Sequence, residues 1–209
     1  MNFNKFKNLR INFLKENCLK DHVVFEGSKS VLLSAPHGIS QVRLGKNKVA
    51  EIGTIPTTIY LKNKCDCFAI IKSKNNFDDA NFDQVSKYKT DIDKLVEKRK
   101  IKHLIDIHGL AANRPFDVNL GINFGKNIEV DTALFDKLVE ILKTAGFVVS
   151  IDQPFSGGTN TVSGSTKTKH PNIWAIQIEI NSAITNRPEN IEKLNRMLDC
   201  LTRFINLIK

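Results

Sequence analysis

The chain has 209 residues, of which 41% are hydrophobic and 25% are charged, as is ordinary for a globular protein. Its longest apolar runs, such as the one at residues 31–35, are far too short to span a bilayer, which excludes a membrane-spanning protein. The first residues form no apolar segment of the secretory type. We therefore expect a cytoplasmic protein whose residues 1–209 form a single domain.

The net charge of +9 admits a nucleic-acid partner, because lysine and arginine neutralise phosphates. The lysines are scattered, however, and the one compact cluster, Lys98-Arg99-Lys100 with Lys102, stands at the expected end of a helix. Positive charge suits that position, where the helix dipole is negative. We therefore favour ordinary solvent-facing lysines over a nucleic-acid surface.

The spacing of the four cysteines matches neither a disulfide framework nor a zinc-binding motif. Cys65 and Cys67 make a C-x-C pair, and no second pair completes a zinc ribbon. Since the chain is neither small nor visibly secreted, we expect Cys18, Cys65, Cys67 and Cys200 to be reduced thiols.

Hydrophobic periodicity and turn residues predict the secondary structure. In chain order, the first half should contain a short amphipathic helix within 1–20, strands at 23–25 and 31–35, a loop or small hairpin at 39–50, a helical segment at 51–61, a strand at 68–71, a polar loop at 73–81 and a helix at 82–100. The second half should contain strands at 103–108 and 118–122, a helix at 132–145, a strand at 147–151, a long Gly/Ser/Thr loop at 152–170, a strand at 173–180 and a closing helix at 189–208.

The predicted strands are short continuous apolar runs rather than alternations of apolar and polar residues. This pattern, with helices between the strands, predicts an α/β fold with a mixed, mostly parallel central sheet and helices on both faces. In such sheets a site lies beyond the carboxyl ends of the strands, so the polar residues there are the candidates for function.

Ionisable residues stand at the ends of three of the predicted strands. His37 follows the first, Asp106 and His108 close the second, and Glu179 lies near the end of the third. Burying a polar group without a partner costs about 2–7 kcal/mol, and a charge costs more. One divalent metal would explain all three placements, because zinc takes imidazole nitrogen and keeps a position open for water.

In that hypothesis His37 and His108 bind the metal and Glu179 takes a proton from the water. Asp106, two residues before His108 on the same face of a strand, could orient a ligand. Each residue also has a structural alternative. A histidine after a strand can simply be buried and hydrogen-bonded, Glu179 can form a salt bridge, and Asp106 can cap a helix.

Four stretches of the sequence resemble the N-formylglutamate amidohydrolase family, relatives of the zinc carboxypeptidases. They are Leu33–Gly38, Leu104–Gly109, Pro154–Gly158 and Ile176–Asn181, whose order and spacing cover most of residues 30–190. The resemblance implies a phosphorylase/hydrolase-like (zinc carboxypeptidase-like) version of the α/β fold, and a zinc site built from two histidines and one carboxylate.

For the metal, the resemblance assigns His37 and His108 as ligands of Zn²⁺. The carboxypeptidase pattern H-x-x-E is absent, because Ser40 stands three residues after His37. Glu51 is the best substitute for the missing carboxylate. The alternative is that Glu51 is an acidic residue in the first turn of a helix, where the dipole favours it.

For catalysis and substrate binding, the resemblance makes Glu179 the catalytic glutamate. Arg114 would polarise the carbonyl or bind a substrate carboxylate, since a guanidinium binds both carboxylate oxygens at once. Arg187 is a second candidate for the carboxylate, although it can equally be a surface arginine. The segment Asp79-Ala80-Asn81-Phe82 resembles the family's D-x-N-R without the arginine. The remaining residues expected to line the substrate pocket are Asn81, Gly157, Gly158 and His170.

The function that follows is zinc-dependent hydrolysis of an amide bond in a small N-acyl (N-formyl) amino acid or short peptide. Two alternatives remain open. One is a catalytically inert zinc-binding relative of the same fold, which is suggested by the absence of an arginine after Asn81. The other is a basic nucleic-acid-binding domain with structural histidines. Nothing in the sequence indicates an oligomeric state.

Overall fold

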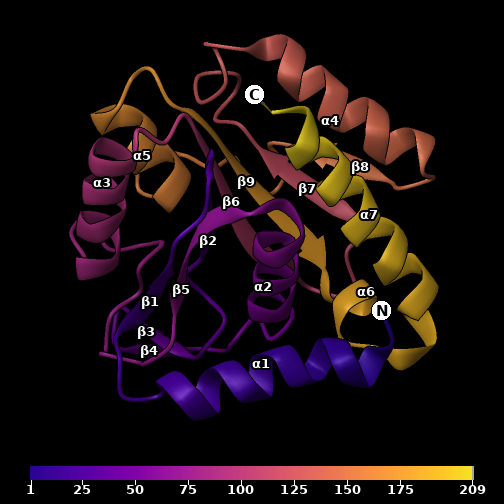
Figure 1. The fold of residues 1–209 in the computed structure, drawn as a ribbon, viewed down its shortest axis with the longest axis horizontal. Helices are drawn as coiled ribbons and strands as arrows, with labels where there is room; N and C mark the ends of the chain where they lie inside the picture. The colour runs from indigo at the N-terminus through magenta and orange to yellow at the C-terminus, as the bar shows by residue number, and fades with distance from the viewer. Residues whose placement is uncertain (209) are drawn as a thin grey trace.

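The structure, a computed structural model, describes residues 1–208. A seven-stranded sheet runs through the molecule in the order β1-β5-β2-β6-β9-β7-β8 (Figure 1). Strands β5, β2, β6 and β9 are parallel, β1 and β7 run antiparallel to their neighbours β5 and β9, and β8 is parallel to β7. The strands are β1 (His22–Phe25), β2 (Lys29–Ala35), β5 (Cys67–Lys72), β6 (His103–Leu110), β7 (Val118–Gly121), β8 (Val149–Ile151) and β9 (Trp174–Asn181), with a separate hairpin of β3 (Gln41–Arg43) and β4 (Lys46–Lys48).

Helices cover both faces of the sheet (Figure 1), which confirms the predicted α/β class. One face packs against α2, α4 and α7, with α1 lying on α2, and the other packs against α3 and α5. The helices are α1 (Phe3–Asn17), α2 (Thr54–Cys65), α3 (Lys87–Arg99), α4 (Thr132–Thr144), α5 (Val162–Lys169), α6 (Ser182–Thr185) and α7 (Ile191–Leu207), with a 3-10 turn η1 (Pro188–Asn190) before α7. Among residues 1–208, none of these helices has the length and apolar character needed to cross a membrane.

Strands β2, β6 and β9 form the centre of the sheet because their side chains are apolar on both faces. All eight residues of β9 are buried, as are the last five of β2. The register pairs Ser34 of β2 with Asp106 of β6, and His108 of β6 with Glu179 of β9. The carboxyl ends of these three neighbouring strands therefore meet at one edge, and the polar residues that follow them come together there.

The structure corrects the prediction of a continuous loop at 152–170, because residues 162–169 form helix α5. Thr161 caps this helix by accepting a hydrogen bond from the backbone N–H of Gly164. A Cβ atom at Gly164 would lie 2.1 Å from the carbonyl oxygen of Gly158, so the close packing of helix on loop requires glycine. The helix is hidden in the sequence because its glycine, serine and threonine residues are weak helix formers.

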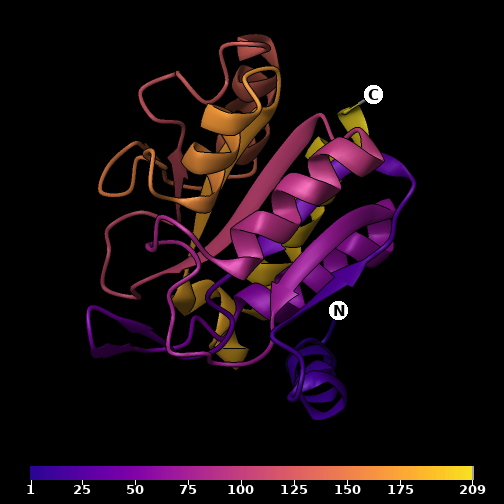
Figure 2. The ribbon, with the colours of Figure 1, turned by 90° about the vertical axis from the view of Figure 1, so that its left-hand side faces the viewer.

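Two other helices begin later than predicted. Helix α3 begins at Lys87 rather than at residue 82, since Ser86 accepts a hydrogen bond from the backbone N–H of Lys89 and caps it. Helix α2 begins at Thr54 rather than at residue 51. The residues just before these helices, around 79–86 and 49–53, are therefore not helical. Their side chains reach the edge where the central strands end. The predicted hairpin within 39–50 is present as β3–β4, which projects from the body of the molecule in Figure 2.

Tyr88 of α3 ties that helix to the sheet just below this edge. Its hydroxyl lies fully buried, donates to the carbonyl of Ile70 at 2.8 Å and accepts from the backbone N–H of Ala35 at 3.0 Å. We predict that Tyr88→Phe lowers the free energy of unfolding by about 1–3 kcal/mol, because it leaves a buried N–H and a buried carbonyl without this partner. Urea denaturation measures the change.

The matched control for that experiment is Tyr60→Phe. The hydroxyl of Tyr60, on the partly exposed side of α2, makes no hydrogen bond within residues 1–208, so this change should leave the free energy of unfolding nearly unaltered. Equal effects of the two substitutions would contradict the structural role of the Tyr88 hydroxyl.

Candidate metal centre

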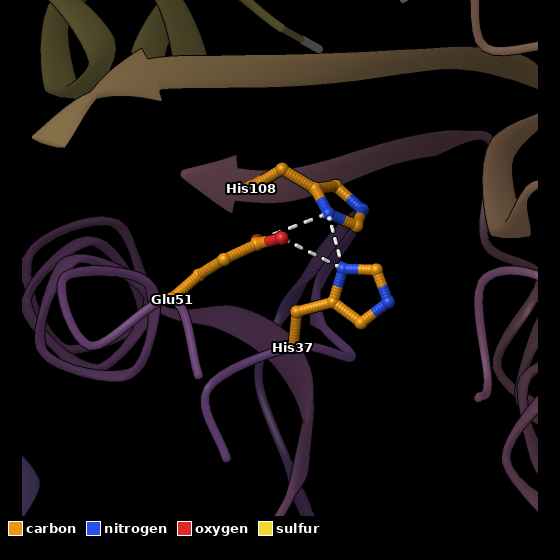
Figure 3. Close-up of side chains that lie close together, drawn as sticks. All are labelled: His37, Glu51 and His108. Carbon is orange, nitrogen blue, oxygen red and sulfur yellow. Dashed lines mark hydrogen bonds and ion pairs between the residues drawn. The ribbon is translucent and has the colours of Figure 1, made fainter. Parts of the chain in front are cut away.

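His37, Glu51 and His108 converge at the carboxyl edge of β2 and β6 (Figure 3). The Nδ1 atoms of His37 and His108 lie 3.1 Å apart. Glu51 places Oε1 2.9 Å from Nδ1 of His37 and Oε2 3.3 Å from Nδ1 of His108. Four ligands at zinc–nitrogen distances of about 2.0–2.1 Å stand roughly 3.3 Å from one another in a tetrahedron. The three side chains therefore have the spacing of a metal-binding set.

The outer nitrogen of each imidazole is held by a fully buried aspartate. Nε2 of His37 lies 2.7 Å from Oδ1 of Asp79, and Nε2 of His108 lies 2.9 Å from Oδ2 of Asp106. A carboxylate at Nε2 keeps the proton there and leaves the lone pair of Nδ1 free to bind a cation. Both lone pairs point at the same place, so the two aspartates prepare the histidines for one ion.

The electrostatics of the cluster call for positive charge at its centre. Burial alone would lower the pKa of His108, but the carboxylates of Asp106 and Glu51 raise it well above 6.5. Burial would likewise raise the pKa of Glu51, yet the two histidines hold it well below 4.5. In addition, Oδ1 of Asp106 is buried without a hydrogen-bond partner among the described residues. A divalent cation would neutralise this acidic cluster, so the donor set fits a metal ion.

Glu51 is positioned by the loop that precedes α2 rather than by the helix itself. Its backbone N–H donates to the carbonyl of His37 at 2.9 Å, and its Oε2 accepts from the N–H of Gly109 at 2.9 Å. A Cβ at Gly109 would lie 3.0 Å from the Cβ of Glu51, so the glycine after His108 gives the carboxylate room. Lys48 donates to Oε1 at 2.6 Å. The alternative reading of Glu51 as a first-turn helix residue is therefore wrong.

Glu179 lies beside this cluster, on the neighbouring strand β9. It is 5% exposed, and its Oε1 accepts a hydrogen bond from the side-chain amide of Gln177 at 2.8 Å. Burial raises the pKa of Glu179 to about 8; the carboxylate of Glu51 adds to the rise and His108 opposes it. A carboxyl group with a pKa in this range can both accept and return a proton near neutral pH.

A cavity of about 530 Å³ opens above the cluster and brings most of the predicted substrate residues together. Asn81, Arg114, Gly157 and Gly158 line it together with Glu179 and the metal-binding set. Gly157 has a left-handed backbone (φ 68°), and a Cβ there would lie 2.8 Å from the carbonyl oxygen of Gly121 on β7. The glycine is therefore needed for packing against the sheet, in addition to any approach of the backbone to a ligand.

Two residues predicted to bind the substrate lie elsewhere, which corrects the sequence-based placement. His170 follows α5 and lines a different hollow, with its Nε2 3.3 Å from a carboxylate oxygen of Asp93. Arg187 is exposed just before η1 and does not line the cavity. The sequence could not show that these two residues lie outside the cavity, because each is close along the chain to a segment that does reach it.

Three further residues, Arg43, Lys48 and Gln177, line the cavity, and Asp79 contacts His37; the sequence patterns did not predict these positions. The D-x-N spacing at 79–81 and the position of Gln177 two residues before Glu179 were the available signals. No signal existed for Arg43 and Lys48, because only the tertiary position of the β3–β4 hairpin carries them to the site.

Solved structures share this fold. An N-formylglutamate amidohydrolase from Ralstonia eutropha JMP134 is 12% identical with a TM-score of 0.64, over 91% of this chain and 99% of that chain. A gene product from Agrobacterium tumefaciens is 13% identical with a TM-score of 0.65, over 96% and 100%. A metallo-carboxypeptidase from Burkholderia cenocepacia is 11% identical with a TM-score of 0.56, over 96% and 68%. The fold is thus the carboxypeptidase-like α/β fold.

The sequence itself matches the family model of N-formylglutamate amidohydrolase over residues 86–185, a range that includes His108, Arg114 and Glu179. This match covers just under half of the chain and agrees with the resemblance that the four sequence stretches predicted. A search of curated proteins gives no match. The match to this family model supports a hydrolase.

We predict that Asp106→Asn weakens zinc binding by about 10- to 100-fold, because an amide holds Nε2 of His108 less firmly and lowers the basicity of Nδ1. Competition with a chromophoric chelator measures the affinity. Asp91→Asn is the control, since Oδ2 of Asp91 also lies 2.9 Å from the Nε2 of a histidine, His22, which is not part of the cluster. Equal affinities of Asp106→Asn and the unsubstituted protein would contradict the proposal that Asp106 orients His108 toward the metal.

A further prediction concerns the stability of the metal-free protein. The pKa of Glu179 is about 8 in the folded state against 4.5 for an ordinary glutamate, so the folded state holds more protons between these values. Stability should therefore fall as the pH rises from about 5 to 8, by up to about 1.4 kcal/mol per pH unit. Glu179→Gln cannot titrate at this position, so its stability should fall less over this range and only by the part that His108 contributes above pH 6.5.

Urea unfolding in the presence of a chelator, at several pH values across that range, checks this prediction. Glu140→Gln, on the exposed side of α4, is the control and should follow the unsubstituted protein. Parallel stability curves for the unsubstituted protein and Glu179→Gln would show that burial does not raise the pKa of Glu179.

Proposed function

We propose that this protein is a zinc-dependent amidohydrolase that cleaves the amide bond of a small N-acyl amino acid, such as an N-formyl amino acid, or of a short peptide. The observation that carries the proposal is the convergence of His37, Glu51 and His108 on one point beside the buried Glu179, at the floor of one cavity. The proposal takes residues 1–209 as one zinc-hydrolase-like domain.

The metal would be held by Nδ1 of His37, Nδ1 of His108 and the carboxylate of Glu51. Two imidazoles and one carboxylate are a typical ligand set of catalytic zinc, which keeps a fourth position for water or substrate. When bound, zinc would polarise the amide carbonyl and lower the pKa of water to about 7.

Glu179 would act as the general base and then as the general acid. Its carboxylate takes the proton of the attacking water and returns it to the amine that leaves. The burial that raises its pKa favours the second step, because it makes the protonated form accessible near neutral pH. The hydrogen bond from Gln177 keeps Oε1 occupied, and so leaves Oε2 as the oxygen available for proton transfer.

Arg114 would stabilise the negative charge that develops on the carbonyl oxygen, or bind a carboxylate of the substrate. It is exposed at the cavity wall and forms no ion pair within residues 1–208. A guanidinium free of acidic partners keeps all its donors for a ligand. Asn81, Gly157 and Gly158 would contact the rest of the substrate from the opposite loops.

The charge of the cavity favours an anionic substrate. Its lining contains the cations Arg43, Lys48 and Arg114 against the carboxylates of Glu51 and Glu179, and a bound zinc ion would add two positive charges. An N-acyl amino acid with a free carboxylate matches this balance.

The four cysteines are free thiols, which is consistent with the reducing cytoplasm that we propose as the location.

An inert zinc-binding relative is the second candidate, and Phe82 is the observation that favours it. This residue stands where the family's D-x-N-R segment has its arginine, so the substrate contact of that arginine is absent at position 82. The two candidates share the metal and differ in turnover, so an assay over N-acyl amino acids separates them.

We predict that the zinc-loaded protein releases amine from N-formyl amino acids and that Glu179→Gln reduces kcat by about 10²- to 10⁴-fold, because the general base is lost. The zinc content of Glu179→Gln should stay at one ion per chain. Chelation should abolish the activity of the unsubstituted protein, and added zinc should restore it.

Glu140→Gln serves as the surface control, and its kcat should equal that of the unsubstituted protein. Full activity of Glu179→Gln would exclude Glu179 as the base. Activity that persists after the metal has been removed, with its removal verified by elemental analysis, would refute the metal mechanism.

A further inference from the structure

The β3–β4 hairpin is anchored to the segment that contains Asp79 and Phe82. The fully buried side chain of Gln41 donates to the carbonyl of Pro36 at 2.5 Å and accepts from the N–H of Ala80 at 2.9 Å. The backbone N–H of Val42 donates to the carbonyl of Asp78 at 3.2 Å. These contacts place the next residue, Arg43, directly beside the loop that should carry the arginine of a D-x-N-R segment.

The side chain of Arg43 lies over that loop. Its Nε donates to Oδ2 of Asp79 at 2.7 Å, and its guanidinium carbon stands 4.9 Å from the centroid of the Phe82 ring. Neither terminal nitrogen of Arg43 has a hydrogen-bond partner within residues 1–208. The side chain is 38% exposed and lines the cavity, so these terminal nitrogens are accessible to a ligand.

We propose that Arg43 supplies, from the hairpin, the guanidinium that the D-x-N-R pattern takes from position 82, and that it binds a carboxylate of the substrate. This inference rests on the proposed amide hydrolysis and names the residue that selects its substrate. Phe82 then acts as a platform, because an aromatic face attracts a guanidinium and fixes its plane while leaving its edge free.

Asp79 gives the arrangement its rigidity. One oxygen of this buried carboxylate holds Nε2 of His37, and the other holds Nε of Arg43. The metal-binding histidine and the substrate-binding arginine are thereby connected through a single side chain. Burial opposes ionisation of Asp79, but His37 and Arg43 together hold its pKa well below the ordinary value. A carboxylate bound to Arg43 would therefore stand at a set distance from the bond that is hydrolysed.

A purely structural role for Arg43 makes a different prediction. If the residue only neutralised Asp79, its loss would weaken zinc binding or stability and would affect all substrates equally. As a carboxylate ligand, it discriminates between an acid and the corresponding amide, since loss of charge-assisted hydrogen bonds affects only the acid. The ratio of the two affinities therefore separates the two roles.

The experiment compares N-formyl-L-glutamate with its α-carboxamide. Binding is measured by calorimetry on zinc-loaded protein in the Glu179→Gln background, which prevents turnover, and kcat and KM are measured on the active protein. We expect Arg43→Met to weaken binding of the acid by about 10- to 100-fold and to leave the amide unchanged. Zinc content is determined for every variant.

Two further variants sharpen the test. Lys46 lies opposite Arg43 in the register of the hairpin and is exposed. Lys46→Met removes its positive charge and should leave both affinities unchanged. Arg43→Met combined with Phe82→Arg returns an arginine to the position that the D-x-N-R pattern uses, and it should recover part of the preference for the acid.

The outcomes distinguish this inference from the proposed function. Binding of the acid no tighter than the amide, or an acid-to-amide ratio that Arg43→Met leaves unchanged, overturns the role of Arg43 even if the protein hydrolyses both compounds. Binding of the acid that depends on Arg43, in a protein without turnover, supports the role of Arg43 and refutes the amidohydrolase activity.

Discussion

Two imidazole nitrogens 3.1 Å apart in a buried site impose the constraint on which the rest of the structure depends. Their lone pairs cannot face one another without a positive charge between them, because the charge of neighbouring groups is poorly screened in a protein interior. Asp79 and Asp106 direct both lone pairs to one point, and Glu51 closes the third side. The carboxypeptidase-like fold thus holds an arrangement that a divalent metal would complete.

The backbone is shaped to let this cluster form. Gly109 leaves room for Glu51 next to His108, and Gly157 allows the loop after β8 to pack on β7 at the cavity wall. Helices α2 and α3 begin several residues later than periodicity predicts, which leaves Glu51 and Asp79 in irregular segments whose side chains can turn toward the metal centre. The late starts of these two helices therefore allow Glu51 and Asp79 to reach the site.

Much of the fold was predictable, because its strands are unbroken apolar runs and most of its helices have a clear periodicity. Helix α5 was not, since the glycine that its packing requires also makes its sequence resemble a loop. The positions of His37, His108 and Glu179 followed from the rule that parallel strands end at one edge. His170 and Arg187 could not be placed in this way, because loops follow no such rule.

The sequence by itself determined the class of fold, the strand ends that carry the chemistry and the family resemblance that the comparison confirmed. It could do so because hydrophobic patterning and short local stretches carry that information. Only the tertiary structure decided which residues join these strand ends. Asp79 reaches His37 across 42 positions, and Arg43 reaches Asp79 across 36. Such contacts depend on the packing of a hairpin against a loop, for which the chain has no local signal.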